Sequence, residues 1–221
     1  MIEDAHFLAR CLRYRFRTER VPLKALRRYN LDGASVLDIG ANKGIYSYWL
    51  SRAVGHEGRV LAFEPQPEMA DYMRRRRLGR NVEIFNVALS DHCGVAKLSR
   101  KRVGDGSASL NRDIGEAITV RTTRLDDLGP IPRLRFIKCD VEGHELSVFR
   151  GGEKTIRASL PIIQFESTPD EIGPVQSFLE GLGYSGLMFS KQGCCAIEDI
   201  KKVPHSKFGF GGHRDFLFCP A

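Results

Sequence analysis

A glycine-containing turn after a short apolar run constrains this chain of 221 residues more than any other feature. Residues 36–37 lead into the segment Asp38-Ile39-Gly40-Ala41-Asn42-Lys43-Gly44, which is typical of a buried strand that ends in a tight turn and opens a helix. Twenty residues past the last glycine of this turn, a second apolar run over 60–63 ends in Glu64. We therefore expect a nucleotide-like ligand over the edge of an α/β sheet, with a carboxylate available for a ribose.

The side chains in the turn discriminate between ligands. A dinucleotide-binding turn has glycine where this chain has Asn42 and Ile45, so a close approach of a pyrophosphate is blocked. A P-loop is excluded because no Gly-Lys-Ser/Thr follows four spacer residues. A ligand with a ribose and no pyrophosphate agrees with both facts, and S-adenosylmethionine is the obvious one. The alternative is a plain strand-to-helix turn, which the position of Glu64 disfavours.

Strands and helices are predicted to alternate along most of the chain, which indicates a mainly parallel, doubly wound α/β sheet. The expected strands are 35–40, 59–64, 82–88, 134–139, 161–166, 184–189 and 214–219, and the expected helices are 45–54, 65–79, a helix after Gly143 and 172–182. Residues 90–123 interrupt the alternation. Their short strands near 95–98 and 118–122, with a glycine-rich loop over 104–109, predict an inserted β-hairpin or small flap.

The first 30 residues form a basic segment. We expect one or two helices there, and divide the chain into a helical extension, 1–30, and a domain, 31–221. Eight basic against three acidic residues give this segment +5 of the net charge of +7. Such clusters attract nucleic acid, phosphate-bearing substrates or an anionic membrane, unless they are simply solvated helix faces. The expected apolar stripe consists of Phe7, Leu8, Cys11, Leu12, Leu23 and Leu26.

The remaining composition is ordinary for a soluble protein. No run approaches the roughly 18 apolar residues of a membrane span, and no signal-peptide pattern is found, so we expect a cytoplasmic protein. None of the six cysteines forms Cys-x-x-Cys or has histidine at zinc-ligand spacing. Reduced structural thiols are the plain interpretation, with a redox-active pair at Cys194 and Cys195 as the alternative.

Acidic residues follow several of the predicted strands, at the edge where open α/β sheets bind ligands. They are Asp38, Glu64, Asp91, Asp140, Glu142 and Glu166. Acids gathered at one edge are costly unless a cation is present, and two cations fit: the sulfonium of S-adenosylmethionine and a divalent metal. Asp140 and Glu166 are the candidate ligands for Mg²⁺.

The segment Asp140-Val141-Glu142-Gly143-His144-Glu145 is the second dense motif, and its candidate catalytic residues are His144, Asp140 and Glu142. His144 is a proton acceptor near neutral pH, as methyl transfer to a hydroxyl requires. Asp140 or a metal-bound water can fill the same role. Equally, His144 and Glu145 can cap the following helix while Asp140 orients the methionine moiety of the cofactor.

Several blocks, taken in order, resemble the FkbM-type methyltransferase family over about residues 35–220. The blocks are Val36-Leu37-Asp38-Ile39-Gly40-Ala41-Asn42-Lys43-Gly44-Ile45-Tyr46-Ser47, Phe63-Glu64-Pro65, Asn86-Val87-Ala88-Leu89-Ser90-Asp91, Ile137-Lys138-Cys139-Asp140-Val141-Glu142-Gly143-His144-Glu145, Gly151-Gly152 and Pro161 to Glu166. The resemblance implies a Rossmann-like, seven-stranded, S-adenosylmethionine-dependent fold whose last strand is antiparallel. It also implies O-methylation of a small molecule, with members acting on polyketides and on sugars of glycolipids or oligosaccharides.

The resemblance also implies roles for individual residues. Asp38, Gly40 and Asn42 would line the methionine end of the cofactor, Glu64 would bind the ribose hydroxyls, and Ala88 with Asp91 would lie near the adenine. The wider predicted cofactor set adds Ala41, Gly44, Pro65, Leu89 and Asp140.

We therefore expect an O-methyltransferase acting on a small-molecule or lipid-linked saccharide acceptor, or on a polyketide. Acceptor contacts are expected from 90–123, from 190–212 and from the N-terminal helices, and the basic N-terminus is expected to meet carrier phosphate or a membrane surface. A second hypothesis is an RNA methyltransferase, prompted by the pI near 9.2. The Asp/Asn-Pro-Pro-aromatic and Pro-Cys motifs of base methyltransferases are missing, so no specific nucleic acid is expected. A third is a non-catalytic S-adenosylmethionine-binding protein, and a fourth is a nicotinamide dehydrogenase, which Asn42 disfavours.

Overall fold

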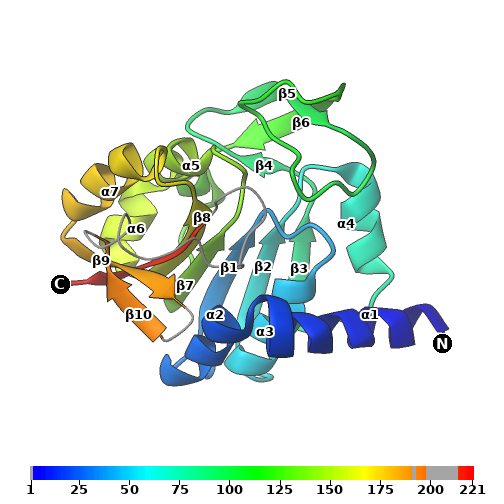
Figure 1. Ribbon diagram of the computed structural model, residues 1–221, viewed down its shortest axis with the longest axis horizontal. Coiled ribbons are helices and arrows are strands. Elements are labelled where there is room, and N and C mark those ends of the chain that lie inside the picture. Colours follow the sequence, from blue (N-terminus) through cyan, green and yellow to red (C-terminus); the bar gives the residue numbers. More distant parts are fainter. Residues whose placement is uncertain (1, 191–192, 198–213) are drawn as a thin grey trace.

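A computed structural model describes residues 2–190, 193–197 and 214–221, which form a sheet between two helical layers (Figure 1). The sheet order is β10-β9-β11-β8-β7-β1-β2-β3. The five strands β3, β2, β1, β7 and β8 are parallel, and β11 runs antiparallel between β8 and β9. The strands are β1 (Ser35–Ile39), β2 (Arg59–Phe63), β3 (Val82–Phe85), β7 (Leu134–Cys139), β8 (Ile162–Ser167), β9 (Tyr184–Ser190), β10 (Gly193–Ala196) and β11 (Arg214–Pro220).

The predicted mainly parallel, doubly wound sheet with an antiparallel last strand is confirmed. The predicted number of seven strands is one too few, because β10 forms an antiparallel hairpin with β9 at the edge of the sheet. The missed strand is short and reads Gly-Cys-Cys-Ala, which lacks the alternation of apolar and polar residues by which a strand is recognised.

Alternate residues of the central strands point to opposite faces of the sheet and belong to two separate apolar layers, because successive side chains of a strand alternate in direction. Val36 and Val60 face the layer that holds α3 (Ile45–Val54), together with α4 (Pro67–Arg74) and the N-terminal helices. Leu37 and Leu61 face α5 (Glu145–Gly151), α6 (Glu153–Ser159) and α7 (Ile172–Glu180) on the other side. Burial on both faces explains why the central strands read as continuous apolar runs.

The N-terminal segment consists of α1 (Ile2–Arg13), the π-helical η1 (Tyr14–Thr18), α2 (Arg20–Ala25) and the 3₁₀-helical η2 (Leu26–Arg28). It packs against the domain, because Phe7 contacts Tyr48 edge-on and Trp49 Nε1 donates a 3.1 Å hydrogen bond to Cys11 O. Of the predicted apolar stripe, Phe7, Cys11, Leu23 and Leu26 are buried, whereas Leu8 and Leu12 are exposed. Only part of the stripe is therefore buried, since Leu8 and Leu12 lie on the side of the helix away from α3.

The insertion forms a second sheet above the carboxyl ends of the central strands (Figure 1). Its strands are β4 (Ala88–Leu89), β5 (Gly94–Arg100) and β6 (Glu116–Thr123), in the order β4-β6-β5. The predicted hairpin is the antiparallel pair β5–β6. The predicted strand 82–88 is divided, since β3 belongs to the main sheet and β4 to the small one. None of the helices among the described residues has the length and apolarity needed to cross a membrane.

Candidate active site

The turn after β1 lies against the turn after β7. Gly40 has a φ of +77°, and a Cβ atom at this position would lie 1.9 Å from the backbone oxygen of Asp140. The Asp140 N–H in turn donates a 2.9 Å hydrogen bond to Ile39 O. Only glycine allows this approach. Asn42 also has a positive φ, of +48°, a conformation that asparagine tolerates better than most residues.

Glu64, at the carboxyl end of β2, lies against the turn after β1. Its carboxylate accepts hydrogen bonds from the backbone N–H groups of Asn42, at 2.7 Å, and of Gln66, at 2.8 Å. Only 2% of the residue is exposed, and burial raises its pKa to about 7, against the opposing effect of the two amides. The sequence placed this acid beside the turn, and the structure brings the two together.

The insertion crosses this edge of the sheet as a strap, residues 104–112. Its first end is fixed to the turns after β1 and β2. The hydrogen bonds there join Lys43 Nζ to Gly104 O at 2.8 Å, Gly104 N to Gln66 Oε1 at 3.1 Å, and the side-chain amides of Asn42 and Gln66 to Asp105 O at 3.4 and 3.3 Å. The strap therefore lies over the turn that the sequence assigns to the cofactor.

The other end of the strap is fixed to the loop after β7. Ser109 Oγ donates to Glu142 O at 2.9 Å, and Arg112 pairs with the Glu142 carboxylate at 3.0 Å. Asn111 Nδ2 donates to Gly143 O at 2.6 Å. These roles were not predicted from the sequence, which indicated only a glycine-rich loop over 104–109, although Ser, Asn and Arg side chains are suited to binding backbone carbonyls and carboxylates.

His144 makes hydrogen bonds through both ring nitrogens. Nδ1 lies 2.9 Å from Asn111 Oδ1, and Nε2 lies 3.0 Å from Ser90 Oγ. Burial lowers the pKa of the ring. The neighbouring Glu145 carboxylate accepts from the N–H groups of Val141 and Gly143, at 3.3 and 3.2 Å, and burial raises its pKa to about 7. Both side chains thus hold the loop that precedes α5. The capping alternative is wrong for His144, which occupies the N-cap position of α5 but makes no side-chain hydrogen bond to the helix.

A buried lysine stands among the acids at the ends of β7, β8 and β11. Lys138 Nζ lies 3.5 Å from Asp140 Oδ2, and the lysine side chain is 4% exposed. Burial lowers the pKa of Lys138, but the carboxylates of Asp140, Asp215 and Glu166 outweigh burial and raise it well above its ordinary value. The protein therefore supplies its own cation to this group of acids, which sequence analysis assigned to a sulfonium or a metal.

Two acids from outside the predicted set complete this group. Asp215 is the register partner of Glu166 across β8 and β11, and Glu19 comes from the N-terminal segment. Burial raises the pKa of Glu19 to about 8 and that of Glu166 to about 9, and neighbouring carboxylates add to both shifts. The signal for the group was Lys138, the charged residue at a buried position of β7, in contrast to the exposed Arg135 of the same strand.

The structure gives no support to the predicted Mg²⁺ site at Asp140 and Glu166. No group of three or more His, Cys, Asp or Glu side chains within the described part of the chain is arranged to hold a metal ion. The two carboxylates instead interact with the Lys138 ammonium.

The other predicted residues lie in varied surroundings. Asp38 is buried, accepts a hydrogen bond from Ser47 Oγ of α3, and has its pKa raised to about 6 by burial. Asp91 is exposed and pairs with His92 Nδ1 at 2.8 Å. Ala88 and Leu89 are buried in β4. Ala41, Gly44 and Pro65 lie in the turns that surround Glu64.

A model of the FkbM methyltransferase domain matches residues 38–185. The chain belongs to the FkbM methyltransferase family. The matched residues include the turn, Glu64, the strap and Lys138, whereas Glu19 and Asp215 lie outside them. Glu19 and Asp215, the two acids of the Lys138 group that were not predicted from the sequence, are therefore also the two that lie outside the family match.

Two curated relatives are similar to this FkbM-family chain. One is the hexuronic acid methyltransferase AglP of Haloferax volcanii, 28% identical over 52% of this chain and 48% of the relative. The other is methyltransferase 1 of Beauveria bassiana, 26% identical over 54% of this chain and 59% of the relative. The chain thus matches about half of the length of these relatives.

Solved structures share the fold. The FkbM methyltransferase of Methylobacillus flagellatus superimposes with a TM-score of 0.59 at 12% identity, over 85% of this chain and 44% of that one. A precorrin-6y C5,15-methyltransferase from Geobacter metallireducens gives a TM-score of 0.53 at 16% identity, over 91% and 86%. At these identities the likeness concerns the fold alone.

Proposed function

We propose that the chain is an S-adenosylmethionine-dependent O-methyltransferase that acts on a hydroxyl of a sugar. The observation that carries this proposal is the Asn42–Glu64 pair, which presents a carboxylate in the nucleotide-binding turn of an FkbM-family domain. Both carboxylate oxygens are oriented by backbone amides and keep further acceptor capacity, so the residues present fit the two hydroxyls of a ribose. Asp38, Gly40 and Asn42 would hold the methionine end of the cofactor.

The bound cofactor supplies an electrophilic methyl group, and the protein has to place the acceptor hydroxyl and take up its proton. Asp140 suits the second task, because its side chain is 38% exposed at the carboxyl end of β7. His144 suits it less well, since both of its ring nitrogens already have partners. We assign the proton acceptor to Asp140, and the fixing of the loop to His144 and Glu142.

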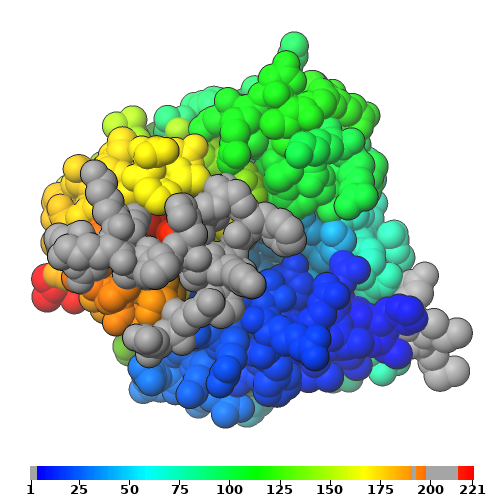
Figure 2. Space-filling view, viewed as in Figure 1, coloured from blue at the N-terminus to red at the C-terminus, as the bar shows by residue number. Residues whose placement is uncertain are grey.

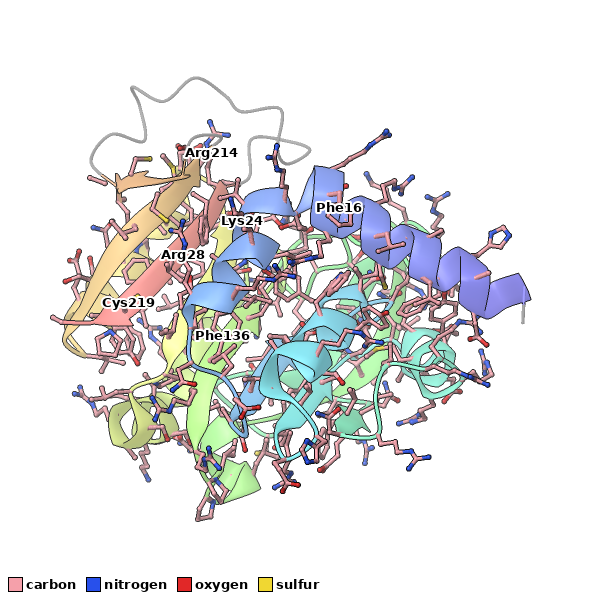
Figure 3. All side chains as sticks on the ribbon, turned by 90° about the horizontal axis from the view of Figure 1, so that it is seen from below. Phe16, Lys24, Arg28, Phe136, Arg214 and Cys219 are labelled. Carbon is pink, nitrogen blue, oxygen red and sulfur yellow. The ribbon has the colours of Figure 1, made fainter. Side chains whose placement is uncertain are left out.

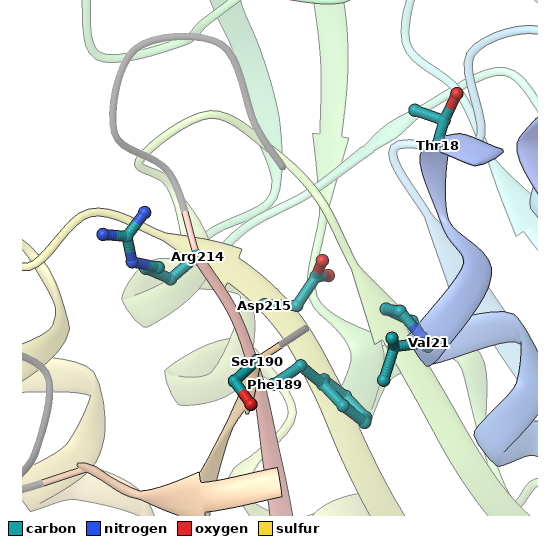
Figure 4. A pocket seen from close by; sticks show the side chains of 7 residues that line it. Thr18, Val21, Phe189, Ser190, Arg214 and Asp215 are labelled. Carbon is teal, nitrogen blue, oxygen red and sulfur yellow. The ribbon is translucent and has the colours of Figure 1, made fainter. Parts of the chain in front are cut away.

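A small hollow beside Asp215 is a candidate contact for one hydroxyl of the acceptor. It is lined by Thr18, Val21, Pro22, Phe189, Ser190, Arg214 and Asp215. One carboxylate oxygen of Asp215 is buried and has no hydrogen-bond partner among the described residues, and the side chain points into the space between Arg214 and Val21 (Figure 4). The hollow has room for about one water molecule, so its carboxylate and hydroxyl groups would bind one hydroxyl of the acceptor while the rest of the sugar stays outside. The similarity to a hexuronic acid methyltransferase agrees with this acceptor class.

The proposal is tested in two stages. Calorimetry should first show that the chain binds S-adenosylhomocysteine. Transfer of a labelled methyl group is then measured onto uronic-acid oligosaccharides, neutral oligosaccharides, a hydroxylated polyketide and RNA, and the product is located by mass spectrometry. We expect label on a saccharide oxygen. Label on RNA, or no binding of S-adenosylhomocysteine, would overturn the proposal.

A further inference from the structure

The N-terminal segment carries a line of exposed apolar side chains. Leu8, Leu12 and Phe16 are 41%, 49% and 65% exposed. Their spacing of four residues places them along one side of α1 and η1, over roughly 12 Å of helix. Phe7 and Cys11, on the other side of the helix, pack against α3, so the apolar line faces outward.

Exposed basic side chains accompany this line along the N-terminal segment, and no exposed acid lies among them within residues 4–28. The exposed basic residues are Arg10, Arg13, Arg17, Arg20, Lys24, Arg27 and Arg28. The acids of this stretch are Asp4 and Glu19, and neither is exposed. The segment forms a band along one side of the molecule (Figure 2), and Figure 3 places Phe16, Lys24 and Arg28 along this band.

We propose that this surface, residues 4–28, docks on an anionic lipid bilayer. Leu8, Leu12 and Phe16 would enter the headgroup region while the surrounding basic residues meet lipid phosphates. Apolar side chains next to Lys and Arg on a helix that lies flat are the features of an interfacial membrane helix. Clustered basic residues are attracted to anionic leaflets and gain roughly fivefold in partitioning for each basic residue near the surface.

Other occupants suit the surface less well. RNA would satisfy the basic residues, but two of the three apolar side chains are aliphatic and offer no ring on which a base can stack. The cores of protein interfaces are depleted of charge, whereas seven exposed basic residues share this segment with the apolar line. A bilayer satisfies both the apolar line and the charges.

The same segment contributes Thr18, Val21 and Pro22 to the hollow beside Asp215. Docking would therefore hold the hollow near the membrane surface, where a lipid-linked saccharide presents its sugar. The docking itself is independent of the proposed chemistry, and its test needs neither cofactor nor acceptor.

The experiment is co-sedimentation of the full chain with vesicles of phosphatidylcholine alone and with vesicles in which about a third of the lipid is phosphatidylglycerol. We expect binding to the anionic vesicles that weakens as salt is raised. The triple variant Leu8→Gln, Leu12→Gln, Phe16→Gln should lower this binding at least about tenfold, because its apolar contact with lipid is lost. Glutamine is a good helix former and these positions are exposed, so the fold should be retained.

A matched control removes three exposed apolar residues elsewhere, through Val95→Gln, Leu128→Gln and Leu160→Gln. The control should bind vesicles as the parent does, and circular dichroism should show equal helix content in both variants. Three results would overturn the proposal: no binding to anionic vesicles, equal vesicle binding by the two triple variants, or RNA binding that displaces the vesicles and is unaffected by Leu8→Gln, Leu12→Gln, Phe16→Gln.

Discussion

The backbone N–H of Asn42 donates a 2.7 Å hydrogen bond to the carboxylate of Glu64, across 22 residues of chain. This contact joins the turn after β1 to the end of β2, and the two residues that define the sequence signature therefore act as one unit. A second amide, that of Gln66, fixes the other carboxylate oxygen. The orientation of Glu64 is thus set before any ligand arrives, which reduces the cost of ordering it on binding.

Replacing Glu64 by alanine should weaken the binding of S-adenosylhomocysteine by about 10- to 100-fold, as expected for the loss of charged hydrogen bonds. Isothermal calorimetry measures the affinity directly. Glu83→Ala is a matched control, because Glu83 is an exposed acid on β3 that pairs with Arg59. Unchanged affinity in Glu64→Ala, with the fold intact by circular dichroism, would rule out the ribose role.

Binding should also depend on pH through the same residue. The pKa of Glu64 is raised by burial to about 7, and the ionised carboxylate is the better acceptor for ribose hydroxyls. Ligand affinity should therefore rise between about pH 6 and pH 8 and level off above, because the carboxylate is protonated at the lower pH and ionised at the higher one. Titrations across this range should show the full rise in the parent. In Glu64→Gln only a smaller rise at the lower pH should remain, from Asp38, whose pKa burial raises to about 6.

Because Asp140 is assigned as the proton acceptor and His144 is not, variants of the two residues should affect turnover differently. Asp140→Asn should lower kcat by about 100-fold or more, with S-adenosylhomocysteine affinity nearly unchanged, because a general base is lost. His144→Gln should lower kcat less than about tenfold and reduce the melting temperature, since it disturbs contacts to Ser90 and Asn111. Single-turnover rates and thermal melts of both variants check this. The reverse pattern would give the base role to His144.

The strap should control how fast the cofactor enters and leaves. Asn111 holds both Gly143 O and the His144 ring, so Asn111→Ala releases the second end of the strap from two of its partners. We expect faster association and dissociation of S-adenosylhomocysteine, each by about fivefold or more, with little change in affinity. Stopped-flow measurements give both rates. Asn81→Ala, at a part-buried amide that bonds to α3 instead of the strap, is the control and should leave the rates unchanged.

The parts of the site that were predictable from sequence are those encoded by neighbouring residues. The turn and its acid follow from local patterns, because glycine marks a positive φ and an acid after an apolar run marks the end of a strand. The group around Lys138 was not predictable in this way. It joins Glu19, Asp140 and Asp215 from distant parts of the chain, and the pairing of Asp215 with Glu166 depends on the register of β11 against β8.

Alanine substitutions at Gly40 and at Gly129 measure how much the close packing of the turn after β1 against the turn after β7 contributes to stability. The φ values of the two glycines are nearly equal, +77° and +78°, but a Cβ atom at Gly40 would lie 1.9 Å from Asp140 O, whereas nothing lies within 4 Å of one at Gly129. Gly129 combines its positive φ with an extended ψ of −175°, a conformation essentially restricted to glycine, so Gly129→Ala should cost about 1–3 kcal/mol in the free energy of unfolding through backbone strain alone. Gly40→Ala should cost at least about 2 kcal/mol more, because either the β1 turn or the β7 turn must shift. Urea unfolding of both variants measures the difference. Equal losses of stability would show that the two turns separate without cost, and that the close contact between Gly40 and Asp140 does not shape the site.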